Sequence, residues 1–292
     1  MSFVIVTDTS ANLPGALLQR HDVGVVPFSY FVEDTAHTCL DIDAFDGTAY
    51  YDAIRGGTRV TTSQINPYRY LESFTPLLES GRDILYVGMS SGISGSYASA
   101  EAAAKELMDR FPARTLRLVD TYSASLGEGI LVLRAITCRD AGMTLDATAE
   151  LLLSLRHCMC QIFTVDDLMH LRRSGRISNV AALAGTVLNI KPLLKGDPLG
   201  RIVSFEKVIG RRRAIRALAD RYASLAVNAA AQTVGIAHAG CAGDAAALAE
   251  MLLQSRPPKE ILTVCYEPVT GAHVGPGALA LFFLGDENVR LK

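Results

Sequence analysis

The sequence contains no tryptophan, and only 20% of its 292 residues are charged. Its 28 basic and 30 acidic side chains nearly cancel, and a net charge of -2 excludes a general attraction to nucleic acid or to an anionic membrane. No apolar run approaches the roughly 18 residues of a membrane span, and the first residues lack the basic segment and cleavage site of a signal peptide. We therefore expect a soluble protein of the cytoplasm.

Cysteine is also sparse, and the six cysteines are too scattered to suggest a disulfide framework. Only Cys158 and Cys160 lie close together, and one intervening residue matches neither the redox motif Cys-x-x-Cys nor half of a zinc site. Asp8, Asp120 and Asp166 end or follow predicted strands, but no spacing joins them into a metal site. We expect reduced thiols, no metal and no cofactor.

Apolar residues make up 49% of the chain and the mean hydropathy is +0.23, so a large core can form. The length allows two domains, because single cores usually stop growing near about 250 residues. Short apolar runs alternate with helical segments in the first half, which predicts an α/β fold with a parallel sheet. Strands are predicted over 3–8, 23–32, 84–88 and 116–120, and helices over 15–21, with Asn12 as N-cap, and 43–54.

The pattern changes near residue 158. A strand is predicted over 161–165, a helix over 180–188, and a hairpin of 190–194 with 201–209 around the turn residues 196–200. We infer two domains, residues 1–158 and residues 159–292.

Two hydroxyl-rich segments are candidate ligand loops. Residues 89–97 follow the predicted strand 84–88 and precede a helix, which places free backbone N–H groups at a helix N-terminus. Residues 60–64 form the second segment. In open α/β sheets ligands bind beyond the carboxyl ends of the strands, so we expect both loops at the same end of neighbouring strands, holding an oxyanion. Capping of helices is the alternative role for each loop by itself.

A glycine-rich turn predicted over residues 271–277 contains His273. Its imidazole can donate a hydrogen bond to a carboxylate at neutral pH. His238, which follows a predicted strand, is the competing candidate. A single histidine is also often a structural residue, and that alternative stays open.

Arginines form two basic groups in the second half, one of Arg172, Arg173 and Arg176 and the other running from Arg211 to Arg213. Guanidinium groups suit the carboxylates and phosphates of a buried anion or of a partner protein, while a solvated surface is the alternative. The sequence has no recognisable nucleic-acid-binding motif. It also lacks the nucleophile-elbow, Walker and zinc-protease motifs.

Seven short motifs follow one another across nearly the whole chain: TDTSANLP (7–14), TSQ (62–64), SGSY (94–97), FTVDDL (163–168), GRIS (175–178), LNIKP (188–192) and HVGPGA (273–278). In this order they resemble the motifs of the DegV family of bacterial fatty-acid-binding proteins, which includes the acyl-carrying B subunit of fatty acid kinase. The resemblance implies an N-terminal three-layer α/β/α sandwich with a parallel sheet and a C-terminal α/β domain with a mixed sheet. It also implies a fatty acid buried between or within them.

The resemblance further implies which residues bind the fatty acid carboxylate. They are Thr62, Ser94, Gly95, His273 and Arg176. It leaves open whether Arg176 or Arg173 belongs to this network. The residues implied to dock the kinase are Arg173, Arg211 and Arg212, although Ile209 stands where the family often has arginine.

We therefore predict a lipid-binding carrier without covalent chemistry of its own. It would bury a long-chain fatty acid such as palmitate and present the carboxylate to a separate fatty acid kinase. Burial contributes about 0.8 kcal/mol per methylene, and a carboxylate cannot enter a dry site unpaired. The alternatives are a phosphotransfer enzyme or hydrolase using Ser94 and His273, and a protein-binding regulator. Transient membrane contact is compatible with this prediction, and neither the acyl length nor the oligomeric state follows from the sequence.

Overall fold

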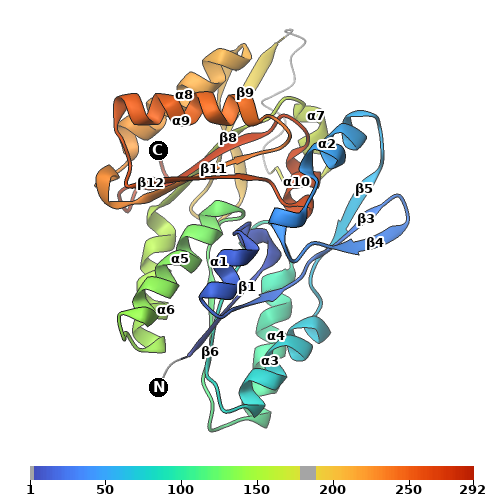
Figure 1. Ribbon diagram of the computed structural model, residues 1–292, viewed down its shortest axis with the longest axis vertical. Coiled ribbons are helices and arrows are strands. Elements are labelled where there is room, and N and C mark those ends of the chain that lie inside the picture. The colour runs from blue at the N-terminus through green and yellow to red at the C-terminus, as the bar shows by residue number, and fades with distance from the viewer. Residues whose placement is uncertain (1–2, 178–188) are drawn as a thin grey trace.

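The computed structural model describes residues 3–177 and 189–292. Figure 1 shows two large β-sheets, one above the other, with helices packed between them and on their outer faces. A smaller sheet of three strands lies beside them, on the right of the view. The chain therefore has the α/β architecture that the alternation of strands and helices predicts.

The lower sheet has four parallel strands, and its two central strands are buried at every position. Parallel strands covered on both faces need apolar residues at successive positions, which explains the continuous apolar runs. In spatial order the strands are β2 (Val23–Val26), β1 (Val4–Asp8), β6 (Ile84–Gly88) and β7 (Leu116–Asp120). One face packs on α3 (Pro67–Glu79) and α4 (Ser96–Arg110), and the other on α1 (Gly15–Arg20), α5 (Leu126–Asp140) and α6 (Leu145–Cys158). The predicted three-layer sandwich with a parallel sheet is confirmed.

The upper sheet has six strands and is mixed, because one neighbouring pair is parallel and the others are antiparallel. In spatial order the strands are β10 (Ile202–Ile209), β9 (Ile190–Gly196), β8 (Met159–Thr164), β13 (Leu279–Leu284), β11 (Thr233–His238) and β12 (Glu260–Cys265). Helices α8 (Arg211–Leu225) and α9 (Ala242–Ser255) cover its outer face. The predicted mixed sheet and the β9–β10 hairpin are confirmed.

Helix α5 lies between the two sheets and belongs to a core that they share. One apolar cluster runs from Ile5 and Leu85 in the lower sheet, through Leu126 in α5, to Phe163 and Phe282 in the upper sheet. The division at residues 158 and 159 falls between α6 and β8. It stays a prediction, because the two halves are packed on one continuous core.

The strand predicted over 23–32 is wrong, because it is two strands in different sheets. Pro27 has no N–H to continue a ladder, and the chain turns there from β2 into β3 (Ser29–Val32). Strand β3 pairs with β4 (Thr35–Thr38) and β5 (Val60–Ser63) in the small antiparallel sheet. The second hydroxyl-rich segment is therefore a strand of this small sheet, and not a loop at the end of the parallel sheet.

Two further local predictions are also wrong. Asn12 does not cap α1, since Pro14 holds the N-cap position and Asn12 is left-handed with φ 56°. The helix predicted over 43–54 begins later, as α2 (Gly47–Arg55), because the Asp46 side chain accepts the N–H of Ala49. The helix predicted over 180–188 lies outside the described residues.

Candidate functional site

His273 lies in the last turn of a short helix, α10 (Pro268–Val274), and not in the predicted glycine-rich turn. The buried carboxyl group of Glu267 caps this helix by accepting the N–H groups of Val269 and Thr270, both at 2.6 Å. This cap and Pro268 at the first helical position begin the helix in spite of Gly271. The helix directs the imidazole of His273 toward β5.

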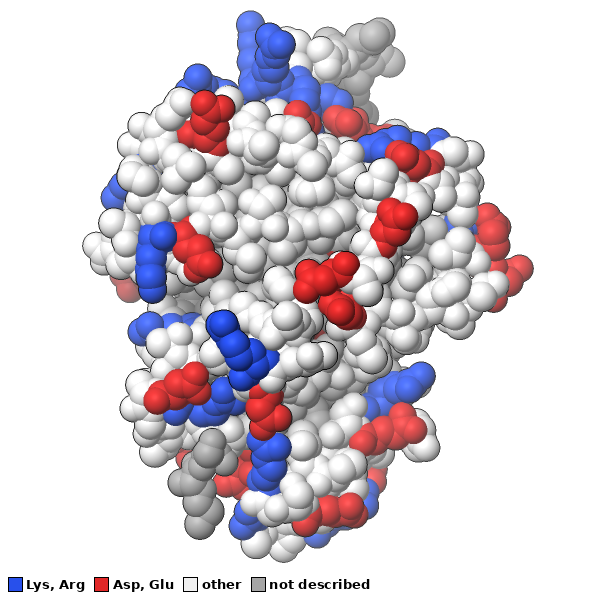
Figure 2. Space-filling model, in the orientation of Figure 1, with Lys and Arg blue, Asp and Glu red and all other residues white. Residues whose placement is uncertain are grey.

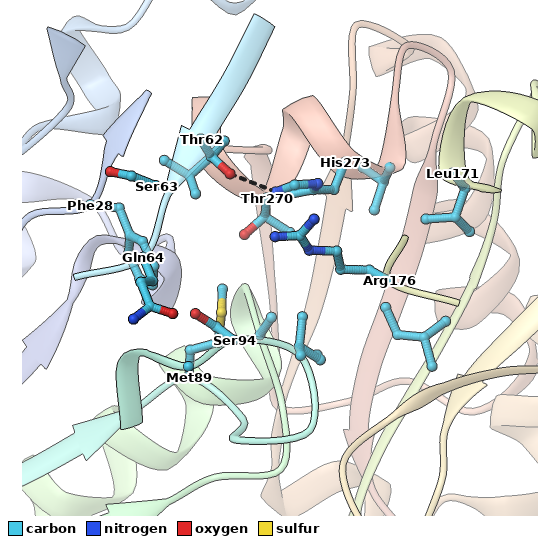
Figure 3. A pocket seen from close by; sticks show the side chains of 16 residues that line it. Phe28, Thr62, Ser63, Gln64, Met89, Ser94, Leu171, Arg176, Thr270 and His273 are labelled. Atoms are coloured by element: carbon cyan, nitrogen blue, oxygen red, sulfur yellow. Dashed lines mark hydrogen bonds between the residues drawn. The ribbon is translucent and has the colours of Figure 1, made fainter. Parts of the chain in front are cut away.

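The imidazole of His273 forms a hydrogen bond with the hydroxyl group of Thr62, with 2.8 Å between Nε2 and Oγ1 (Figure 3). Burial lowers the pKa of His273 to about 4, and the positive charge of Arg176 contributes to the shift. At neutral pH the ring is therefore uncharged and can donate one hydrogen bond and accept another.

Ser94, which borders the cavity, shares a hydrogen bond with Ser96. Ser96 Oγ accepts the N–H of Ile65 at 3.0 Å and lies 2.9 Å from Ser94 Oγ, and either hydroxyl group can be the donor between them. Ser94 Oγ also accepts the N–H of Ser96 at 3.2 Å. When Ser96 donates to Ser94, the hydroxyl hydrogen of Ser94 is free for an acceptor in the cavity. The Ile65–Ser96 bond also joins the end of the Thr62 segment to the start of α4.

Thr62, Ser94 and His273 line a cavity of about 160 Å³ (Figure 3). The predicted residues Thr62, Ser94, Gly95, Arg176 and His273 all border it. They reach it from β5, the loop before α4, the segment after α7 (Leu168–Arg173), and α10. The apolar walls include Phe28, Met89, Ile93, Leu171, Ile202 and Val274. The cavity therefore lies between the two halves of the chain and has both polar and apolar walls.

A polar groove of about 430 Å³ adjoins the cavity, and Thr62, Arg176 and His273 border both. Arg176 has no carboxylate partner among the described residues, and its one hydrogen bond goes to the carbonyl oxygen of Ser174. Arg173 borders only the groove and pairs with Asp167 at 3.5 Å. Of the two arginines, Arg176 is the one placed to reach a carboxylate in the cavity.

The predicted docking arginines differ in how accessible they are. Arg173 and Arg212 are exposed. Arg211 is half-buried and held by Asp244, with 2.8 Å between Nε and Oδ2, and by Asp166 at 3.6 Å. Figure 2 shows basic side chains gathered at the top of the view, over α8 and β9, whereas charges of both signs are scattered elsewhere on that face. Arg211 mainly stabilises the start of α8, and the exposed arginines remain available to a partner.

Thr270 and Gln64 also border the cavity, although neither was among the predicted ligand-binding residues. Once α10 is known, Thr270 follows from its position three residues before His273, since such residues share one helix face. Gln64 packs against Gly95, where an added Cβ would lie 2.3 Å from Gln64 Oε1. Gln64 ends the second hydroxyl-rich segment, so its place in that segment was the available signal.

His238 and the three aspartates do not join this site. His238 is absent from the lining of the cavity and the groove. Within residues 3–177 and 189–292 no cluster of three or more His, Cys, Asp or Glu side chains could hold a metal ion. Among the helices of this same part of the chain, none is long and apolar enough to cross a membrane.

A sequence model of the uncharacterised DegV family matches residues 2–286. The chain belongs to the DegV family. A DegV domain-containing protein of Clostridium perfringens is 37% identical over 288 residues, which cover 97% of this chain and 98% of that protein. One from Streptomyces coelicolor is 33% identical, with 95% of this chain and 96% of the relative covered. The family resemblance of the seven motifs is thereby confirmed.

Solved structures of DegV-family proteins have the same fold. A protein from Thermus thermophilus described by its fatty acid binding has a TM-score of 0.87 and 30% identity, covering 98% of this chain and 100% of that one. A fatty-acid-binding DegV-family protein from Streptococcus agalactiae has a TM-score of 0.84 and 27% identity, with 98% and 99% covered. A DegV-family protein from Ruminococcus gnavus, solved with vaccenic acid, has a TM-score of 0.85 and 26% identity, with 97% and 99% covered.

Proposed function

We propose that this DegV-family chain binds a long-chain fatty acid, with the carboxylate between Thr62, Ser94, His273 and Arg176 and the acyl chain among the apolar walls. The observation that carries the proposal is that hydrogen-bond donors from both halves of the chain meet in a cavity with apolar walls. Fatty acids bound to structurally similar DegV proteins support it.

The donors suit a carboxylate because they can offer hydrogens to it. Ser94 has a hydroxyl hydrogen for the ligand when Ser96 donates to Ser94, and Thr62 has one when the neutral ring of His273 donates to Thr62. Arg176 supplies the positive charge, and charge-assisted hydrogen bonds are roughly twice as strong as neutral ones. A buried carboxylate requires such partners, because its desolvation is costly.

A long acyl chain requires the apolar walls to move apart. The cavity of about 160 Å³ is close to the ~150 Å³ cavity that holds a benzene molecule, so it has room for a short apolar group. Met89, which lines it, has a flexible, unbranched side chain that can change rotamer at modest cost. Each methylene buried in this way contributes about 0.8 kcal/mol.

We further propose that the bound carboxylate is presented through the polar groove to a separate fatty acid kinase. The kinase would transfer the γ-phosphoryl group of ATP to a carboxylate oxygen, giving an acyl phosphate and ADP. Arg173 in the groove and Arg212 on α8 would contact the kinase. This chain would then act as a carrier, because Ser94 is bonded to Ser96 and His273 to Thr62, and the described residues contain no Ser94–His273 hydrogen bond that would activate a nucleophile.

Native mass spectrometry of protein purified from cells tests the first proposal. We expect a complex whose excess mass equals one long-chain fatty acid, and lipid extraction should identify that acid. Protein that carries no acid and does not bind added palmitate would contradict fatty acid binding. Adding a fatty acid kinase and ATP tests the second proposal, since an acyl phosphate should form only with the carrier present. If the loaded carrier gives no acyl phosphate with any bacterial fatty acid kinase, presentation to a kinase is refuted, while fatty acid binding is not.

A further inference from the structure

Two carboxyl groups in the lower half of the molecule are buried against each other. Asp8 is 1% exposed and Glu128 is 0% exposed, and the hydroxyl group of Ser10 lies between them. Ser10 Oγ is 2.6 Å from Asp8 Oδ1 and 2.5 Å from Glu128 Oε2. Within the described part of the chain no lysine or arginine forms an ion pair with either group. Neither carboxyl group lines the proposed fatty acid cavity.

A count of hydrogens shows that this pair holds one proton. Ser10 has a single hydroxyl hydrogen, yet its oxygen is within hydrogen-bond distance of both carboxyl groups. If both were ionised, one of these close oxygen pairs would contain no hydrogen. One carboxyl group must therefore be protonated and donate to Ser10, while Ser10 donates to the other.

The surrounding donors indicate which group is ionised. Asp8 accepts four hydrogen bonds when ionised, from the N–H and hydroxyl groups of Ser10, the hydroxyl of Tyr86 at 2.8 Å and the N–H of Met89 at 3.1 Å. An ionised Glu128 would have only the hydroxyl groups of Thr7, at 2.9 Å, and Ser10, and Thr7 shares its single hydrogen with the carbonyl oxygen of Val87 at 2.8 Å. Four donors stabilise a buried anion better than two, so the charge belongs on Asp8.

We propose that Glu128 is a neutral carboxylic acid that donates its hydrogen to Ser10, and that with ionised Asp8 it positions the loop that carries Ser94. Asp8 binds the N–H of Met89, whose side chain lines the fatty acid cavity. The loop then turns so that the N–H of Ser94 bonds to the carbonyl oxygen of Ser90 at 3.1 Å. Asp8 and Glu128 are thus positioning residues, and their effect on the ligand rests on the proposed function.

The other titratable groups around the pair agree with this assignment. Burial raises the pKa of Glu128 well above its usual value, and the charges of Asp8 and Glu267 raise it further. Burial also raises the pKa of Asp8, and the hydrogen bonds to its carboxylate lower this pKa in part. The remaining neighbours, Tyr86 and Tyr70, share a hydrogen bond of 2.9 Å, and burial raises both pKa values, so the tyrosines stay neutral.

The variants Glu128→Gln and Asp8→Asn form a matched pair of isosteric substitutions. An amide at position 128 can still donate to Ser10 and accept from Thr7, so palmitate affinity should stay within about twofold of wild type. An amide at position 8 would direct its N–H groups at other donors, and the affinity should fall by about tenfold or more. The opposite ranking, with Glu128→Gln the more damaging change, would overturn the proposal.

The pH profile of unfolding tests the proton without any ligand and remains available if Asp8→Asn fails to fold. Folded wild type keeps the Glu128 proton that the unfolded chain loses above about pH 4.5, so the contribution of Glu128 to the free energy of unfolding should fall as pH rises above this value. In Glu128→Gln the slope of the free energy of unfolding against pH should be less negative than in wild type, by up to the equivalent of one bound proton. Parallel profiles would refute the protonated Glu128 even if fatty acid binding holds. If the slopes of the two proteins differ but wild type does not bind palmitate, the protonated Glu128 is supported and only the proposed function is refuted.

Discussion

The hydroxyl group of Ser94 illustrates how a single hydrogen decides what a site can bind. Its oxygen accepts the backbone N–H of Ser96, and when the Ser96 hydroxyl also donates to it, the hydrogen of Ser94 is free for a ligand in the cavity. Thr62 and His273 meet there from segments that are 211 residues apart in the chain. Their mutual hydrogen bond uses one of the two hydrogens of this neutral pair and leaves the other for an anion, which distinguishes this site from an ordinary patch of buried hydroxyl groups.

The substitution Ser94→Ala should weaken palmitate binding by about 1.5 to 3 kcal/mol, roughly tenfold or more, because one hydrogen bond to a charged group is lost. The free energy of unfolding should change little. Isothermal titration with palmitate and urea unfolding measure the two effects. Ser154→Ala is the matched control, since that exposed serine only bonds to the carbonyl oxygen of Leu151 in α6. Equal affinities for Ser94→Ala and the control would remove Ser94 from the site.

His273 should make the protein less stable in acid. Its pKa is about 4 in the folded protein, mainly because of burial, against about 6.5 in an unfolded chain. As pH falls from about 6.5 to about 4, the unfolded chain takes up this proton first, so the free energy of unfolding decreases. His273→Gln should show a shallower decrease in urea unfolding across this range.

Part of the slope should remain in that variant, because the pKa values of His157 and His238 are also lowered by burial. His37→Gln, on the exposed strand β4, is the control variant. An unchanged slope in His273→Gln would show that the imidazole is not held neutral by the fold.

The loop before α4 depends on the β9–β10 turn for its position. Ser90 Oγ donates to the carbonyl oxygen of Gly200 at 2.9 Å, which joins the two halves beside the cavity. Gly92 lies so close to this turn that an added Cβ would be 2.6 Å from the carbonyl oxygen of Leu199. These are backbone atoms, so a side chain at position 92 must displace the turn or the loop.

Gly92→Ala should therefore lower the free energy of unfolding by about 1 to 3 kcal/mol and also weaken palmitate binding. Thermal unfolding and a binding titration test both effects. Gly243→Ala in α9 is a suitable control, because a Cβ there meets nothing within 4 Å and alanine favours helix. A Gly92→Ala protein as stable and as tightly binding as this control would contradict the close contact.

Arg290, near the end of the chain, connects the two halves by hydrogen bonds. It is 4% exposed, and its guanidinium donates to the carbonyl oxygens of Tyr122, Arg156 and Asp197 and to the hydroxyl group of Ser123. These acceptors come from both sides of the shared core. The planar guanidinium donates hydrogen bonds to several acceptors in fixed directions, and a lysine ammonium on a flexible stem does not reproduce this geometry.

Arg290→Met should lower the free energy of unfolding by about 3 kcal/mol or more, because several buried oxygens lose their donor. Arg290→Lys should restore only a small part of this loss. Arg117→Ala is the control, with an expected change below about 1 kcal/mol, since Arg117 forms an exposed ion pair with Asp146. Urea unfolding of the three variants measures the ranking, and an Arg290→Met protein as stable as Arg117→Ala would refute the connecting role.

Patterns that depend on neighbouring residues predicted much of this fold. The apolar runs of β1, β6 and β7 indicated strands of a parallel sheet, and the residues of the β9–β10 turn indicated a hairpin. Helix α10 was missed because its sequence resembles a turn, and its start depends on the Glu267 cap. The position of Glu267 depends in turn on Asn12, whose side chain accepts the Glu267 N–H at 2.9 Å from the other half of the chain.

The sequence by itself determined the alternation of strands and helices, the mixture of apolar and hydroxyl-rich segments, and the motifs of the family. These are local properties, because hydrophobic period and turn chemistry act over a few residues. Only the tertiary structure decided that Thr62 enters from a separate small sheet and meets His273 and Ser94. It also decided that Asp8 and Glu128 share one proton, since such contacts depend on the packing of segments far apart in the chain.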